Sequence, residues 1–72
     1  MAQKIKRSKL DLGKKIQKLR KNKDLTQEEL AETLRISRTH MGHIEQGRKS
    51  PSMELLEKIA RVLKVQVKDL FS

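Results

Sequence analysis

The chain is 72 residues long, enough for one small domain, and its 18 Lys or Arg outnumber nine Asp or Glu to give a net charge of +9. A chain of this size buries only about 60% of its unfolded surface, which leaves little room for an enclosed catalytic pocket. The absence of cysteine excludes disulfides and thiolate chemistry, and no apolar run approaches the ~20 residues that span a bilayer, so we expect a soluble, cytoplasmic, non-enzymatic protein.

Residues 1–9 are rich in Lys and Arg and show no apolar periodicity, which predicts a flexible basic arm. The folded domain is expected to cover residues 10–72. It begins with an amphipathic helix in which Leu12, Ile16 and Leu19 recur at helical spacing, and this helix should end between residues 22 and 24.

A second and a third helix follow with few residues between them. Thr26 and Glu29 have the spacing of a capping box, which predicts a helix start at Thr26. Ser37 is a good N-cap for the third helix, and Gly47 is its expected stop. The apolar residues of these two helices should face inward: Leu30, Ala31, Leu34, Met41 and Ile44. Two short helices joined this tightly cross steeply, which is the layout of a helix-turn-helix.

The rest of the chain predicts a loop and two more helices. Residues 47–50 form the loop, and Pro51 with Ser52 opens a fourth helix. One stripe of this helix is apolar and should be buried: Leu56, Ile59, Ala60 and Leu63. A short fifth helix is expected at residues 67–71. The predicted fold is therefore an all-α, compact five-helix domain.

Charge is distributed unevenly along these elements. The net charge is +8 for residues 1–24, −2 for residues 25–46 and +3 for residues 47–72. The basic residues thus flank the helix-turn-helix, as expected if they hold phosphates while the third helix contacts bases. Membrane-surface binding and stacking on single-stranded nucleic acid both favour aromatic residues, and Phe71 is the only one here. Duplex DNA is the favoured partner.

A series of short motifs in a fixed order supports the same interpretation. They are LR at residues 19–20, LTQEELA at 25–31, IS at 36–37, IEQG at 44–47, PS at 51–52, KIA at 58–60 and LF at 70–71. In this order they resemble the Cro/cI-type, or XRE-like, helix-turn-helix family of phage repressors and bacterial regulators, with its lambda-repressor-like fold. The stretch from Arg38 to Arg48 is most similar to the controller proteins of restriction-modification systems.

The resemblance implies base contacts from the third helix. Arg38 and Thr39 match the positions from which the family reads bases, and His43 lies one turn further along. An arginine can donate two hydrogen bonds to guanine, and a threonine methyl can pack on thymine. For Arg38, a phosphate contact without base reading is the alternative.

The resemblance also implies phosphate contacts around the third helix. Gln27 matches a family glutamine that bonds a phosphate, although a solvated polar residue is the alternative, and Ser37, Arg48 and Lys49 are further candidates. The basic residues of the arm either follow the DNA backbone or enter a minor groove, or they make no defined contact. Gly42 either allows close approach of the helix to DNA or relieves packing against the first helix.

Two further positions have structural roles by the resemblance. Arg20 and Glu45 match a partly buried ion pair between the first and third helices, which fixes the reading helix. Arg35 replaces a common glycine at the turn, so a left-handed conformation there would carry about 1 kcal/mol of strain. The alternative is a slightly different turn.

Catalytic and metal sites are not expected. His40 and His43 stand three residues apart, but a pair of histidines without a third ligand is insufficient for a metal site. No nucleophile with its base, no acid pair and no phosphate-binding loop is recognisable. We therefore expect no cofactor.

The apolar tail predicts self-association. The tail is unusually apolar for its length, since it contains Val65, Val67, Leu70 and Phe71. The resemblance implies a twofold interface in this region, where the family commonly has one. The sequence thus predicts a transcription regulator that binds an inverted-repeat operator in double-stranded DNA as a homodimer. The alternatives are an antitoxin that binds its operator and a toxin protein, and an RNA-binding role.

Overall fold

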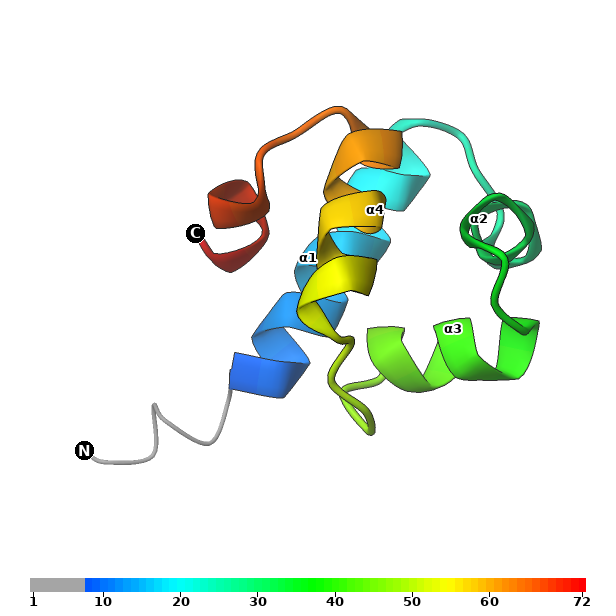
Figure 1. Cartoon of the computed structure of the whole chain (residues 1–72), viewed down its shortest axis with the longest axis horizontal. Helices are drawn as coiled ribbons and strands as arrows, with labels where there is room; N and C mark the ends of the chain where they lie inside the picture. Colours follow the sequence, from blue (N-terminus) through cyan, green and yellow to red (C-terminus); the bar gives the residue numbers. More distant parts are fainter. Residues whose placement is uncertain (1–7) are drawn as a thin grey trace.

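The computed structural model describes residues 8–72, which form four α-helices and one 3-10 helix and contain no strand. The elements are α1 (Ser8–Asn22), α2 (Gln27–Leu34), α3 (Arg38–Glu45), α4 (Met53–Leu63) and η2 (Val67–Phe71) (Figure 1). The all-α class is confirmed, but the expected fifth helix is a 3-10 helix. A turn of this kind closes with tighter i to i+3 bonds, such as the one from the amide of Asp69 to the carbonyl of Gln66 at 2.9 Å, and it suits a segment too short for a stable α-helix.

The first helix begins earlier than the sequence indicated. Ser8 and Lys9, which we had assigned to the arm, are the first two residues of α1. Residues 1–7, which hold the rest of the predicted arm, lie outside the described part of the chain.

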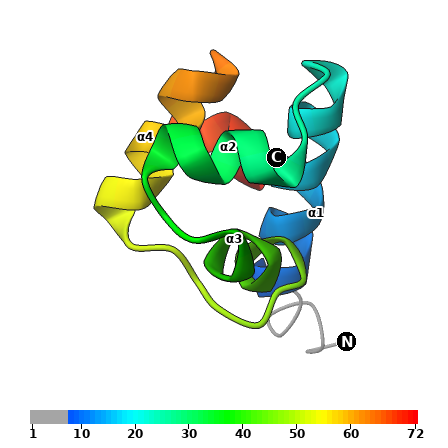
Figure 2. The ribbon, with the colours of Figure 1, turned by 90° about the vertical axis from the view of Figure 1, so that its right-hand side faces the viewer.

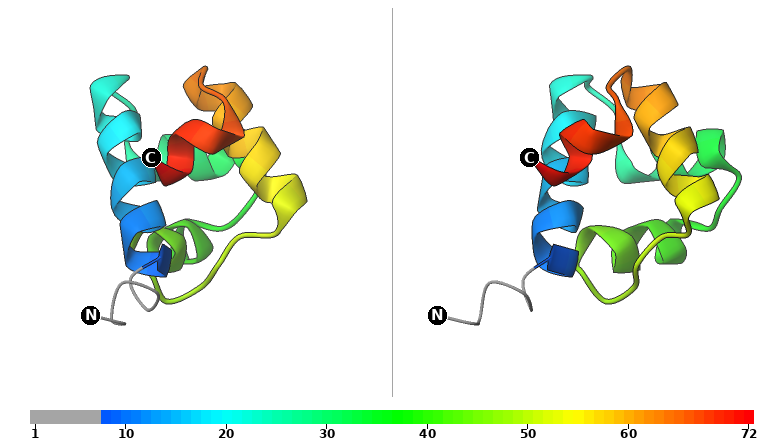
Figure 3. Two further views of the ribbon diagram at one scale, coloured as in Figure 1. Left: turned by 90° about the vertical axis from the view of Figure 1, so that its left-hand side faces the viewer. Right: turned by 60° about the vertical axis from the view of Figure 1, so that its left-hand side comes forward.

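The helices divide the molecule into two ends. Helices α2 and α3 lie together at one end and cross steeply, whereas η2 lies at the opposite end (Figure 1). Figure 2 shows α2 and α3 in front, flanked by α1 and α4. Figure 3 shows η2 lying against α1 and α4, the two helices that it contacts. The long helices α1 and α4 therefore join the helix-turn-helix end to the C-terminal end.

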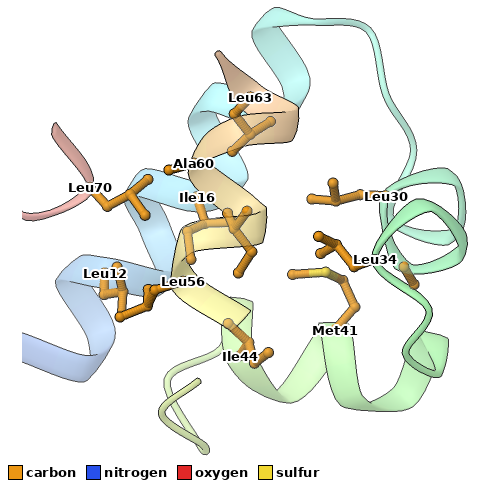
Figure 4. Packing of buried hydrophobic residues seen from close by; sticks show 12 residues of the cluster. Leu12, Ile16, Leu30, Leu34, Met41, Ile44, Leu56, Ala60, Leu63 and Leu70 are labelled. Atoms are coloured by element: carbon orange, nitrogen blue, oxygen red, sulfur yellow. The ribbon is translucent and has the colours of Figure 1, made fainter. Parts of the chain in front are cut away.

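One apolar core connects all five elements (Figure 4). Its members are Leu12, Ile16, Leu30, Ala31, Leu34, Met41, Ile44, Leu56, Ile59, Ala60, Leu63 and Leu70. Every residue that the helical periodicity placed inward belongs to this core except Leu19, which packs against it while half-buried. Met41 and Ile44 hold α3 through its inner face, so the opposite face of that helix stays at the surface.

Helix α1 crosses α3 at a glycine. A Cβ atom added to Gly13 would lie 2.5 Å from the carbonyl oxygens of both Ile44 and Glu45. Real Cβ atoms essentially never come within 3.0 Å of such an atom, and the obstacle here is backbone that cannot rotate away. Gly13 therefore sets the distance between α1 and the C-terminal end of α3.

Among the helices of residues 8–72, none combines the length and the apolar character needed to cross a membrane.

Candidate nucleic-acid interface

Helices α2 and α3 are bounded by the capping groups that the sequence predicted. The Thr26 hydroxyl accepts a hydrogen bond from the amide of Glu29 at 3.0 Å, and the Glu29 carboxylate accepts one from the amide of Thr26 at 2.8 Å. The Ser37 hydroxyl accepts one from the amide of His40 at 2.9 Å. Each pair satisfies backbone N–H groups that have no partner inside the helix. The capping box and the N-cap are confirmed.

The turn between the two helices is made by Arg35 in a left-handed conformation. Its φ is 63° and its ψ 41°, and its amide donates to the carbonyls of Ala31 and Glu32. For a residue with a Cβ this conformation costs about 1 to 2 kcal/mol. The strained turn is therefore confirmed, and it lets Ser37 start α3 two residues later.

The exposed face of α3 contains the residues expected to read bases. Arg38 and Thr39 are exposed, and His43 is half-buried one turn further along. Within residues 8–72 the only ion pair is between Arg20 and Glu45, so the Arg38 guanidinium is not held by a carboxylate. No hydrogen bond to the Arg38 side chain is present among residues 8–72 either, so within this part of the chain its donors have no partner.

A shallow hollow brings these side chains together with groups from α2 and from the loop after α3. It is lined by Gln27, Arg38, Thr39, Gly42, His43, Gln46 and Arg48. Five of the predicted site residues thus share one surface. Backbone bonds from the amides of Arg48 and Lys49 to the His43 carbonyl, at 2.9 and 3.3 Å, hold the loop against the end of α3.

Two predicted phosphate-binding residues do not line this hollow. The Ser37 hydroxyl already caps α3, although the residue remains exposed at the start of the helix. Lys49 is exposed in the adjoining loop. Gln46 also lines the hollow, although it was not among the predicted site residues. Gln46 comes three residues after His43 and seven after Thr39, and in a helix this spacing places all three residues on the same face. The spacing could therefore have predicted that Gln46 lies beside them.

The predicted ion pair of Arg20 and Glu45 is present and buried. The Arg20 Nε donates to Glu45 Oε2 at 2.7 Å, and an Nη donates to Oε1 at 3.1 Å, so the pair is bidentate. Only 8% of the Arg20 side chain and 0% of the Glu45 side chain are exposed. A third guanidinium bond, 2.7 Å long, reaches the carbonyl of Leu25 in the loop before α2.

Gln27 joins the same carboxylate. Its Nε2 donates to Glu45 Oε1 at 3.0 Å, and Gln27 is half-buried at the first position of α2. One carboxylate at the end of α3 therefore receives hydrogen bonds from side chains of both α1 and α2. In the described part of the chain, no buried side-chain nitrogen or oxygen atom lacks a partner.

The structure distinguishes the two interpretations of Gly42. The three atoms nearest to an added Cβ all belong to Gln27, the closest being Oε1 at 3.6 Å, which is ordinary van der Waals contact. Relief of packing against α1 is therefore the wrong explanation for Gly42. That role belongs to Gly13, for which no sequence pattern predicted a role.

The predicted interface residues in the tail separate into two groups. Leu70 is 1% exposed and packs in the core of the single chain. Phe71, its neighbour, is 57% exposed. Val65 and Val67 are half-buried against the core.

Comparison with known proteins places this geometry in a family. The family model described as Helix-turn-helix (HTH_3) matches residues 16–70. The chain is 42% identical over 65 residues to the control protein C.MunI of a Mycoplasma species, and the match covers 89% of this chain and 88% of C.MunI. It is 41% identical over 63 residues to the transcriptional activator BcrR of Enterococcus faecalis, covering 88% of this chain but only 31% of BcrR.

A solved structure shows the same fold along nearly its whole length. The restriction-modification controller protein C.AhdI of Aeromonas hydrophila superposes with a TM-score of 0.81 at 31% identity, covering 86% of this chain and 94% of C.AhdI. The region that the family model matches includes the complete helix-turn-helix. The chain therefore belongs to the helix-turn-helix family of DNA-binding transcription regulators of the XRE (Cro/cI) type.

Proposed function

We propose that this chain is a sequence-specific regulator that binds an inverted-repeat operator in double-stranded DNA as a homodimer. The observation that carries the proposal is the hollow on α3, where Arg38 and Thr39 lie beside Gln27 and Arg48. In this arrangement donors suited to bases are flanked by donors suited to phosphates.

Among the biological settings of such regulators, control of a restriction-modification system has the most support. The chain matches C.MunI and C.AhdI along most of their lengths, whereas it spans less than a third of BcrR. C.MunI is a control protein and C.AhdI a restriction-modification controller. No feature of the hollow favours the antitoxin alternative.

The division between base reading and phosphate binding is tested with two substitutions. Binding first needs an operator, recovered by selecting bound duplexes from a random pool. Arg38→Ala should then weaken operator binding by about 1 to 3 kcal/mol and relax the preference at one base position. Lys49→Ala should weaken binding to all DNA sequences alike and should lower the slope of log affinity against log salt concentration by about one.

A matched control removes a positive charge elsewhere. Lys68 is exposed on η2, at the end of the molecule opposite α3 (Figure 1). Lys68→Ala should leave both sequence preference and salt dependence unchanged. If Arg38→Ala lowered affinity for operator and mixed-sequence DNA equally, the base-reading role would be wrong.

The exposed aromatic side chain of the tail supports the homodimer. Phe71 borders a groove between α1 and η2 at the end away from α3. In a twofold dimer on DNA, each α3 must lie about 17 Å from the axis, half of one turn of duplex. Principal-axis extents of 38 × 23 × 22 Å allow this spacing when the axis passes near the η2 end.

Sedimentation in the analytical ultracentrifuge tests the dimer. Phe71→Ala should weaken self-association, because an exposed ring of this size is the apolar group that a second copy would cover. Met53 is 62% exposed against 57% for Phe71, so Met53→Ala is the matched control and should leave association unchanged. A single monomeric species, with operator DNA and without it, would contradict the dimer.

A further inference from the structure

The hydrogen bond between Gln27 and Glu45 links the core of the domain to its DNA-facing surface. Gln27 lines the hollow on α3, whereas the Glu45 side chain is completely buried. The 3.0 Å hydrogen bond from Gln27 Nε2 to Glu45 Oε1 therefore connects the buried ion pair to a residue of the hollow.

The Glu45 carboxylate is itself held in place. Both of its oxygens accept bonds from the Arg20 guanidinium, at 2.7 and 3.1 Å. Arg20 is in turn fixed by its 2.7 Å bond to the Leu25 carbonyl and by burial of the residue to 7% exposure. Glu45 therefore presents Oε1 to Gln27 from a fixed position.

An ionised carboxylate accepts hydrogen bonds and cannot donate them, so it distinguishes the two ends of a glutamine amide. The nitrogen of Gln27 can face Glu45, whereas the carbonyl oxygen would be repelled. The amide nitrogen carries two hydrogens, and Glu45 uses one of them. The second hydrogen remains available as a donor, which is the group that a phosphate needs.

We propose that Glu45 is a positioning residue for DNA binding, which orients the Gln27 amide so that an N–H group and not the carbonyl oxygen meets a phosphate. Without Glu45 the amide would turn over freely, and half of its orientations would present an oxygen to the phosphate. The inference rests on the proposed DNA-binding function. It adds that the ion pair of Arg20 and Glu45 contributes to DNA affinity, through Gln27, as well as to the stability of the fold.

A double-mutant cycle of Gln27→Ala and Glu45→Gln tests the link. Dissociation constants are measured on the selected operator and on a mixed-sequence duplex of the same length, at a temperature where circular dichroism shows each variant folded. Gln27→Ala should weaken binding to both duplexes about tenfold without changing the salt dependence of binding, because the lost donor to a phosphate is uncharged. Glu45→Gln should weaken binding about twofold in the original chain, because half of the amide orientations would no longer present a donor, and have no further effect in the Gln27→Ala chain.

Equal losses from Glu45→Gln in both backgrounds would overturn the proposal, since Glu45 would then act on α3 independently of Gln27. Absence of DNA binding by the unaltered chain would instead contradict the proposed function. The two failures are therefore distinguishable.

Glu45→Gln removes the charge that faces a buried arginine and can unfold the domain, so a second measurement uses the unaltered chain. Nuclear magnetic resonance resolves the two side-chain amide protons of Gln27. On addition of the mixed-sequence duplex, the proton that faces Glu45 should keep its chemical shift while the other moves. Equal movement of both protons, or movement of neither, would refute the orientation by Glu45.

Discussion

Replacement of Gly13 by alanine should separate close packing from helix propensity. Alanine is favoured over glycine inside a helix by about 1 kcal/mol, so helix propensity alone predicts that Gly13→Ala stabilises α1. The structure predicts the opposite, because the new Cβ would lie 2.5 Å from two carbonyl oxygens of α3. Relief of that overlap requires α1 and α3 to move apart.

Overpacking of this kind costs about 1 to 3 kcal/mol or more, which should exceed the gain in helix propensity. We expect Gly13→Ala to lower the free energy of unfolding by up to about 2 kcal/mol net. In a domain of this size the midpoint of thermal unfolding falls by roughly 4 to 8 °C for each kcal/mol. Displacement of α3 should also weaken DNA binding.

Gly42→Ala is the matched control for this experiment. Gly42 also lies inside a helix, but an added Cβ meets only the Gln27 side chain at an ordinary 3.6 Å. This variant should gain up to about 1 kcal/mol from helix propensity. Urea unfolding followed by circular dichroism measures both variants. If Gly13→Ala were as stable as Gly42→Ala, the close crossing of α1 and α3 would not constrain the fold.

Two further substitutions test the ion pair and the left-handed end of α4. Arg20→Ala leaves the buried Glu45 carboxylate with only the hydrogen bond from Gln27. This substitution should lower the free energy of unfolding by about 3 to 5 kcal/mol. An unchanged midpoint of thermal unfolding would contradict the stabilising role of the ion pair. Lys64 ends α4 with a φ of 62°, so Lys64→Gly should be more stable than Lys64→Ala by about 1 kcal/mol in urea unfolding. Both variants lose the same charge, and equal stability would show that the left-handed backbone carries no strain.

Much of the fold could be predicted from the sequence because its signals are local. A capping hydroxyl acts on an amide three residues away, and an apolar stripe requires only that every third or fourth residue be apolar. Thr26, Ser37 and the apolar faces of the helices therefore marked the elements correctly. The ion pair of Arg20 and Glu45 was also predicted, but only through the family resemblance, since no local rule joins residues on two separate helices.

Tertiary structure decided the features that depend on how closely separate elements approach. Leu70 and Phe71 are adjacent and both apolar, yet one enters the core and the other stays exposed, because only packing of η2 against α1 and α4 selects which side chain points inward. Gly13 is needed where two backbones meet, and Gln27 reaches Glu45 only once α2 and α3 have packed together. The sequence by itself determined which helices form and that they make a helix-turn-helix. The packing of those helices decided which side chains remain exposed on the surface of α3.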